Sequence, residues 1–194
     1  MGISFGSWRL VLALPNLGIV IKFPFPLCNI GNVFIFWRCA GAPKSFKGIN
    51  YLVRGIVKCF WKAFQINWHE FTYYRQSRHP ILQPTHFSFL GLFNIQRYGL
   101  PCRTDNWNLP MQIDIITNDK IKEYCDPHHF QAQYNFNLVG GKLHIHDYGD
   151  VQTQQALDHF ADILYEDFDP NREVNKDEWE TVRWPNRKRP KPKE

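Results

Sequence analysis

The sequence predicts an α+β protein in which short antiparallel strands are combined with a few helices. Pairs of short apolar segments separated by turn residues predict strand pairs in both halves of the chain. Residues 51–78 contain no proline and carry apolar side chains at helical spacing, which predicts a long helix. The 194 residues suit one ordinary domain or two small lobes, and a hydrophobic share of 44% excludes wholesale disorder.

The first part of the chain predicts a hairpin followed by a loop region. Residues 7–14 and 17–23 are apolar and β-prone, and a proline and an asparagine separate them, which is typical of a hairpin. Residues 32–38 predict a third strand, and residues 41–48 predict a loop.

The long predicted helix leads into a second strand pair. His79 and Pro80 end the helix, because the residue before a proline disfavours helical backbone. Residues 85–90 and 92–96 then predict two apolar strands that are hinged at Gly91.

The second half predicts a hairpin and an amphipathic helix. Residues 101–110 are a polar connector, and residues 111–124 do not favour one type of structure. Residues 135–139 and 142–146 flank a Gly-Gly pair, and they form the clearest hairpin pattern in the chain. Residues 151–168 carry apolar side chains on one helical face and acids on the other.

Charge is distributed unevenly along the chain, although the net charge is only +5. Residues 1–104 contain twelve Lys and Arg residues but a single carboxylate, Glu70. Nine acids then occur between residues 158 and 180. An isolated acid in a basic segment is expected to have cationic neighbours, so Glu70 is a candidate for a specific ion pair.

Basic and aromatic residues are interleaved in the first half, and this pattern has three interpretations. The cations and aromatic rings could bind nucleic acid through phosphates and base stacking. The basic face could instead dock to an acidic host protein, or to the acidic segment 158–180 within one molecule or between two. In the third interpretation, the aromatic residues form the core and the cations are solvated.

The compartment is predicted to be the cytoplasm, or the host cytoplasm for a viral protein. The five cysteines are odd in number and widely spaced, which favours free thiols in a reducing environment. The apolar stretch near the N-terminus is interrupted by Pro15, Lys22 and Pro24, so it predicts neither a signal peptide nor a membrane span. We therefore expect a soluble protein with no membrane partner.

Histidines offer an alternative site near the second hairpin. Its members would be a cysteine and four histidines: Cys125, His128, His129, His144 and His146. No second spaced pair of ligands accompanies them, so packing beneath a polar cleft is favoured over a zinc centre.

Four residues form the constellation that best suits chemistry. Lys22 lies near a strand end, and a strand-borne lysine can bind phosphates if a carboxylate such as Glu70 orients it. Asn135 and Asp147 flank the second hairpin, and their side chains supply the hard oxygen ligands that Mg²⁺ prefers.

The order of these motifs resembles the protein-kinase-like superfamily, particularly its short, divergent members from bacteriophages and bacteria. The shared pattern comprises an Ile-Lys strand, an Asn-x-x-Glu helix and a His-Pro-x-Leu-x-Pro segment, followed by an Asn-Phe-x-Leu hairpin that leads into Asp-Tyr-Gly. In this chain these motifs lie at Ile21-Lys22, Asn67–Glu70, 79–84 and 135–149.

The resemblance implies a minimal bilobal fold that binds ATP and Mg²⁺. Residues 1–100 would be an N-lobe with an antiparallel sheet, a helix and a helical insertion. Residues 101–180 would be a reduced C-lobe, and residues 181–194 a basic, disordered tail. Lys22 and Glu70 would bind the nucleotide, and Asn135 and Asp147 would hold the metal.

The sequence departs from the family at the catalytic base. Kinases place an Asp five residues before the metal-binding Asn, and that position is Phe130 here, which implies a pseudokinase. An alternative register begins at Asp126, which would be the base of a small-molecule phosphotransferase. That register needs four extra residues before Asn135, or it places Gln131 at the metal. The chain also lacks a glycine-rich phosphate loop and most of the lobe that binds protein substrates.

Overall fold

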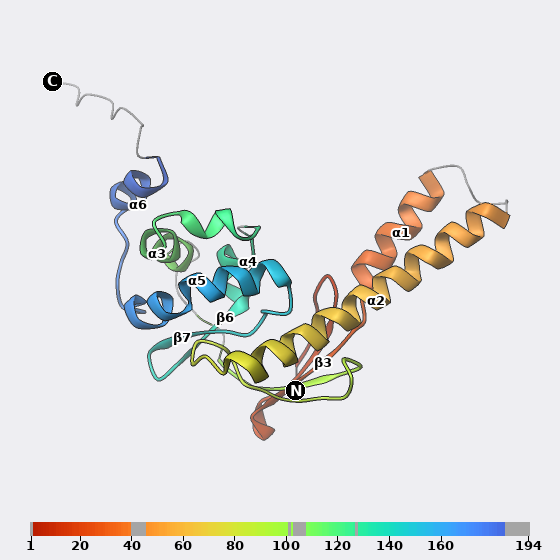
Figure 1. Ribbon diagram of the computed structural model, residues 1–194, viewed down its shortest axis with the longest axis horizontal. Coiled ribbons are helices and arrows are strands. Elements are labelled where there is room, and N and C mark those ends of the chain that lie inside the picture. Colours follow the sequence, from red (N-terminus) through yellow and green to blue (C-terminus); the bar gives the residue numbers. More distant parts are fainter. Residues whose placement is uncertain (1, 40–45, 101, 103–107, 127, 185–194) are drawn as a thin grey trace. The chain divides into compact units, whose positions relative to one another are not determined.

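The computed structural model of the protein describes residues 2–39, 46–100, 102, 108–126 and 128–184 (Figure 1). The chain divides into two compact units. The first unit comprises residues 1–78 and 83–98, and the second comprises residues 79–82 and 99–194. The prediction of an α+β fold is confirmed, because the described residues combine an antiparallel sheet with helices.

The first unit contains a five-stranded antiparallel sheet with the strand order β1-β2-β3-β5-β4. Its strands are β1 (Gly2–Phe5), β2 (Leu10–Leu14), β3 (Ile19–Phe23), β4 (Thr85–Ser88) and β5 (Asn94–Arg97). The two predicted strand pairs are present as β2-β3 and β4-β5, whereas β1 was not predicted. A short 3₁₀ turn (Pro15–Leu17) joins β2 to β3 and ends at Gly18, whose φ of 66° suits glycine.

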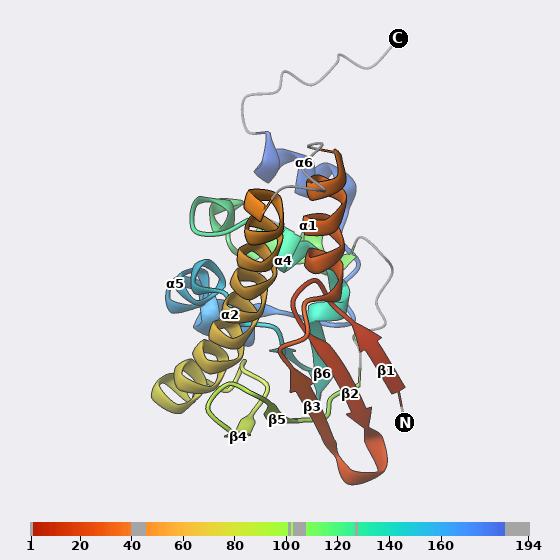
Figure 2. The same ribbon diagram turned by 90° about the vertical axis from the view of Figure 1, so that its right-hand side faces the viewer.

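Two helices lie side by side in the same unit, as Figures 1 and 2 show. Helix α2 (Phe46–Ser77) confirms the predicted long helix, although it begins inside the segment predicted as a loop. Helix α1 (Leu27–Cys39) replaces the strand predicted at 32–38, and that prediction was wrong.

The close contact between the two helices accounts for this error. A Cβ atom at Gly55 of α2 would lie 2.7 Å from Cγ1 of Val33, so the glycine allows α1 to approach closely. Helix packing of this kind overrides the β-propensity of a Val-Phe-Ile-Phe run, because local preference is weaker than tertiary context.

The second unit is built from a two-stranded sheet and helices. Its elements are α3 (Asn108–Ile116), α4 (His128–Gln131), β6 (Phe136–Val139), β7 (Lys142–Ile145), α5 (Val151–Asp167) and α6 (Lys176–Arg183), with 3₁₀ turns at Lys120–Glu123 and Gln133–Asn135. The hairpin β6-β7 and helix α5 confirm their predictions. Gly140 and Gly141 both have positive φ, as a two-residue hairpin turn requires.

Helix α3 lies at the junction of the predicted connector and the segment 111–124, for which the sequence favours no one type of structure, and helix α6 was not predicted. The beginning of α3 overlaps the predicted connector 101–110, and α6 occupies part of the acidic segment. The side chain of Asn175 caps α6 by accepting a hydrogen bond from the Asp177 backbone amide. The basic, disordered tail predicted for residues 181–194 is wrong at its beginning, because residues 181–183 form the last turn of α6. Residues 185–194 lie outside the described residues.

Candidate functional site

Two cationic side chains bind the carboxylate of Glu70 in the first unit. Nζ of Lys22 lies 2.9 Å from Oε2 of Glu70, and Nη1 of Arg9 lies 2.6 Å from the same oxygen. Glu70 is fully buried, and Lys22 is only 2% exposed. Attraction between charges is stronger at low effective dielectric constant, and it opposes the cost of removing them from water. The structure therefore brings Lys22 and Glu70 together, with Arg9 as a member of the cluster that the sequence did not predict.

Strand register places the two cations on one face of the sheet. Lys22 of β3 lies opposite Val11 of β2 and opposite Asn94 of β5. Arg9 is two residues before Val11, so its side chain has the same orientation as that of Val11.

Two buried asparagines connect this cluster to its surroundings. Nδ2 of Asn67 donates to the carbonyl oxygens of Lys22 and Gly91, each at 3.2 Å. Nδ2 of Asn94 donates to the carbonyl of Asn67 at 2.8 Å and to Oε1 of Glu70 at 3.3 Å. Both oxygens of the Glu70 carboxylate are thus hydrogen-bonded, which fixes its orientation.

The side-chain oxygens of these two asparagines are buried. Neither Oδ1 of Asn67 nor Oδ1 of Asn94 has a hydrogen-bond partner within the described part of the chain. Leaving a buried acceptor without a donor costs about 1–3 kcal/mol. The hydrogen bonds donated by the two Nδ2 groups therefore hold these amides in place despite this cost.

Asn135 and Asp147 lie in the second unit, at the two ends of the hairpin β6-β7. The backbone amide of His146 donates to the carbonyl of Asn135 at 3.0 Å, so Asp147 directly follows the residue paired with Asn135. Asn135 is buried, and its Nδ2 donates to the carbonyl of His129 at 2.9 Å. This bond uses the nitrogen of the amide, and the oxygen is the atom that a cation would bind.

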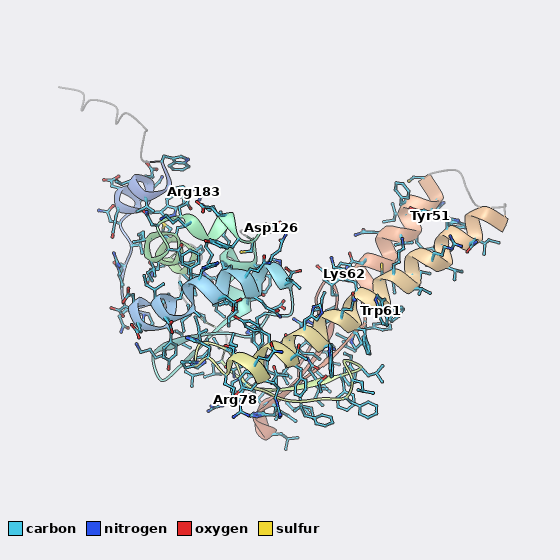
Figure 3. The ribbon with its side chains drawn as sticks, viewed as in Figure 1. Tyr51, Trp61, Lys62, Arg78, Asp126 and Arg183 are labelled. Carbon is cyan, nitrogen blue, oxygen red and sulfur yellow. The ribbon has the colours of Figure 1, made fainter. Side chains whose placement is uncertain are left out.

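The two positions that the sequence considered for the base have different environments. Phe130 is buried, and its ring centroid lies 6.1 Å from that of Phe136, so Phe130 is a core residue. Asp126 is exposed and precedes α4, where its carbonyl accepts a hydrogen bond from the His129 backbone amide at 3.2 Å (Figure 3).

The alternative cysteine and histidine site can be assessed for all members except His128, whose side chain is outside the described residues. No group of three or more His, Cys, Asp or Glu side chains comes together among the residues that the structure describes. Burial raises the pKa of the Cys125 thiol to about 11, with smaller contributions from the carboxylates of Asp126 and Asp150. A thiol with this pKa is almost entirely protonated at neutral pH.

The chain was also compared with known proteins. No family model, curated protein or solved structure matches it. No helix in the described part of the chain has the length and apolarity needed to cross a bilayer. The resemblance to the kinase-like superfamily thus depends on the sequence motifs.

Proposed function

We propose that the protein binds a nucleoside triphosphate such as ATP together with Mg²⁺. The observation that carries this proposal is the 2.9 Å contact between Nζ of Lys22 and Oε2 of Glu70. A lysine on a strand, oriented by a carboxylate on a neighbouring helix, is a recurring arrangement for binding nucleotide phosphates.

In this proposal Lys22 binds the phosphates, and Glu70 holds its ammonium in position. An ammonium group has three donors, so a bond to Glu70 is compatible with a further bond to a phosphate oxygen. Because the strand, the helix and two buried asparagines already order Lys22 and Glu70, phosphate binding does not have to order these side chains. Arg9 places a second positive charge beside the same oxygen of the Glu70 carboxylate.

Asn135 and Asp147 are the residues that would hold Mg²⁺. One amide oxygen and one carboxylate suit this cation, which commonly takes one or two protein oxygen ligands and completes its shell with water and phosphate. When bound, Mg²⁺ would neutralise part of the negative charge of the phosphates. The hydrogen bond from Nδ2 of Asn135 to the His129 carbonyl fits this role. It holds the amide through its nitrogen, whereas the cation would bind the amide oxygen.

We propose binding, rather than efficient transfer to protein substrates, as the core activity. Phe130 cannot accept a proton, and its buried ring contributes to packing. Phosphotransfer to a small molecule would depend on Asp126, an exposed carboxylate four residues before Phe130. The protein is thus proposed to be a degenerate kinase-like protein, with Asp126 as the candidate base for any phosphotransfer.

A thermal-shift titration with ATP, in the presence and absence of Mg²⁺, tests the proposal. At a hundredfold excess over the dissociation constant, a ligand stabilises the native state by about 2.7 kcal/mol, so the melting temperature should rise clearly. Asp147→Ala should remove the Mg²⁺-dependent part of the rise, whereas Asp158→Ala, at an exposed position of α5, should retain it.

Two results would contradict the proposal. An unchanged melting temperature of the wild-type protein at millimolar Mg-ATP would contradict nucleotide binding. A rise of equal size in the wild-type protein and in Asp147→Ala would contradict the binding of Mg²⁺ by Asp147. Turnover of ATP that disappears in Asp126→Ala, with binding retained, would add phosphotransfer to the binding function.

A further inference from the structure

Helix α2 carries two parallel ridges of exposed side chains. The apolar ridge consists of Ile49, Val53, Val57 and Trp61, which follow one another at intervals of four residues. These four side chains are between 51% and 61% exposed. The spacing places them in one inclined row on the helix surface, because positions four apart in sequence are neighbours on that surface.

A basic ridge runs beside the apolar ridge. Its members, Arg54, Lys58 and Lys62, are also exposed and are also four residues apart. Each follows an apolar-ridge residue by one position, which turns it by about 100° around the helix axis. Trp61 and Lys62, one from each ridge, are labelled in Figure 3. One side of α2 therefore presents an apolar line and a cationic line to its surroundings.

Neighbouring segments of the first unit extend the apolar ridge. The ring of Trp61 stacks on that of Phe64, with centroids 5.7 Å apart. A Cβ atom at Gly91 would lie 3.3 Å from the ring of Phe64, so the loop between β4 and β5 lies against this ring. Exposed apolar side chains continue along that loop at Phe89, Leu90 and Leu92.

Leu90 is held in an unfavourable backbone conformation while its side chain is exposed. Its φ is 48°, in the left-handed region that favours Gly and Asn, and its side chain is 62% exposed. A side chain with a Cβ atom makes this backbone conformation unfavourable. A turn alone would be better served by Gly or Asn, so this leucine points to a surface that uses its apolar side chain.

The charge pattern indicates what covers this surface. Glu70 is the single carboxylate in residues 1–104, so nothing along the ridges repels an anionic partner. Aliphatic side chains such as Val53, Val57 and Leu90 cannot stack on bases, which disfavours nucleic acid as the main occupant. A helix that lies in a bilayer interface combines Trp, Phe and Leu with Lys and Arg in this way.

We propose that the two ridges and the loop 89–92 form a docking surface for an anionic lipid bilayer. The apolar ridge and Leu90 would enter the boundary between headgroups and acyl chains, and Arg54 and Lys58 would bind anionic headgroups. This is a peripheral contact that needs no spanning helix, and it departs from the sequence-based expectation of no membrane partner. It does not rest on nucleotide binding, since the side chains proposed to enter the bilayer or bind headgroups do not include Arg9, Lys22 or Glu70.

Flotation of the full chain with lipid vesicles tests the proposal. Vesicles of phosphatidylcholine with about 30 mol% phosphatidylglycerol should carry the protein upward at low salt, and phosphatidylcholine alone should carry much less. The double variant Arg54→Gln/Lys58→Gln should bind about 30-fold more weakly, because each cation near an anionic surface contributes about 1 kcal/mol. Its matched control, Lys120→Gln/Lys176→Gln, removes two exposed cations of the second unit and should bind like the wild type.

A second pair of variants isolates the apolar contribution. Val57→Ser/Trp61→Ser should reduce binding about tenfold or more, because insertion buries apolar side chains. Val151→Ser/Trp184→Ser, at exposed positions of the second unit, should leave binding unchanged. The tryptophan emission should shift to the blue on vesicle binding, and Trp61→Phe should abolish most of that shift.

Three outcomes would overturn the proposal. The wild-type protein could remain at the bottom of the gradient with anionic vesicles. The ridge variants, shown to be folded by circular dichroism, could float as well as their controls. Binding to an RNA oligonucleotide or to an acidic protein, lost in Arg54→Gln/Lys58→Gln and accompanied by no vesicle binding, would assign the ridges to that class of partner.

Discussion

Each unit of the protein contains a buried carboxylate, but the two carboxylates are bound in different ways. Glu70 in the first unit directly contacts two cations at 2.6 and 2.9 Å. Asp114 in the second unit accepts a hydrogen bond of 2.8 Å from Nε1 of Trp179, while the cations of Lys122 and Arg183 lie 3.8 and 4.0 Å away.

This difference shows how partners decide the state of a buried acid. Burial raises the pKa of Asp114, and the Trp179 hydrogen bond and the distant cations offset it only in part. Glu70 has cations in direct contact and lies in a segment without other acids. Asp114 thus attaches helix α6 to α3 through Trp179, whereas Glu70 holds Arg9 and Lys22, the cations of the proposed phosphate site.

The largest expected effect is at Glu70. Glu70→Gln should lower the free energy of unfolding by about 3–5 kcal/mol, because it leaves Lys22 and Arg9 buried with a neutral partner. Urea unfolding followed by circular dichroism measures this loss. Glu180→Gln, on α6, serves as the control, and a partly exposed surface acid should change stability by less than about 0.5 kcal/mol.

A double-mutant cycle sharpens the assignment to the ion pair. Lys22→Met combined with Glu70→Gln should cost less than the sum of the two single substitutions, because residues in contact do not act independently. Strict additivity, or a loss below about 1 kcal/mol for Glu70→Gln, would show that the Glu70 contacts do not hold the first unit together.

An intermediate effect is expected at Asp114 and Trp179. Trp179→Phe removes the donor to Asp114 and should cost about 1–3 kcal/mol, the typical effect of leaving a buried acceptor unpaired. It should also raise the pKa of Asp114 further, because this hydrogen bond lowers that pKa. Trp184→Phe provides a control at a residue that is 42% exposed. A larger loss in the control than in Trp179→Phe would contradict the role of this contact.

The raised pKa of Asp114 also predicts how stability depends on pH. Its folded-state pKa lies above the ordinary value of 3.8, so the native state binds the proton more tightly than the unfolded state does. The stability from this group is complete below about pH 4 and is lost as the pH rises through the folded-state pKa. Asp114→Asn should remove this decline, measured as the difference in unfolding free energy between wild type and variant across pH 3–8. A difference that grows with pH in favour of the wild type would contradict the assignment.

The smallest effect concerns the thiols of the two units. Cys28 and Cys39 of the first unit are exposed, whereas Cys125 is buried and its thiol pKa is about 11. At pH 8 only ~0.1% of Cys125 is a thiolate, so iodoacetamide should label the exposed thiols first and Cys125 only after denaturation. Mass spectrometry of the labelled peptides distinguishes them. Rapid labelling of Cys125 in the folded protein would show that its surroundings are more open than the structure has them.

Several features of the fold could be predicted because they depend on local patterns. The hairpins β2-β3 and β6-β7 consist of short apolar or β-prone segments joined by turn residues, and the helices α2 and α5 have helical spacing of apolar residues. Helix α1 could not be predicted in this way, because its β-prone residues become helical through contact with α2 near Gly55.

The candidate site shows the same division. The isolation of Glu70 among cations is visible in the sequence, and it pointed to an ion pair with Lys22. The participation of Arg9 and Asn94 was not visible, because it depends on the register of β2, β3 and β5. Asp114 was missed for a similar reason, since its partner Trp179 is 65 residues away on a helix that the sequence did not predict.

The α+β class, the main strand pairs, the long helix and the isolation of Glu70 can thus be read from local patterns in the sequence. Which polar groups meet, and which apolar side chains of α2 stay exposed, depends on packing between distant segments. Periodicity reports only how apolar and polar side chains are arranged within one segment. Contacts such as Arg9 to Glu70, 61 residues apart, depend instead on strand register and on how a helix packs against the sheet.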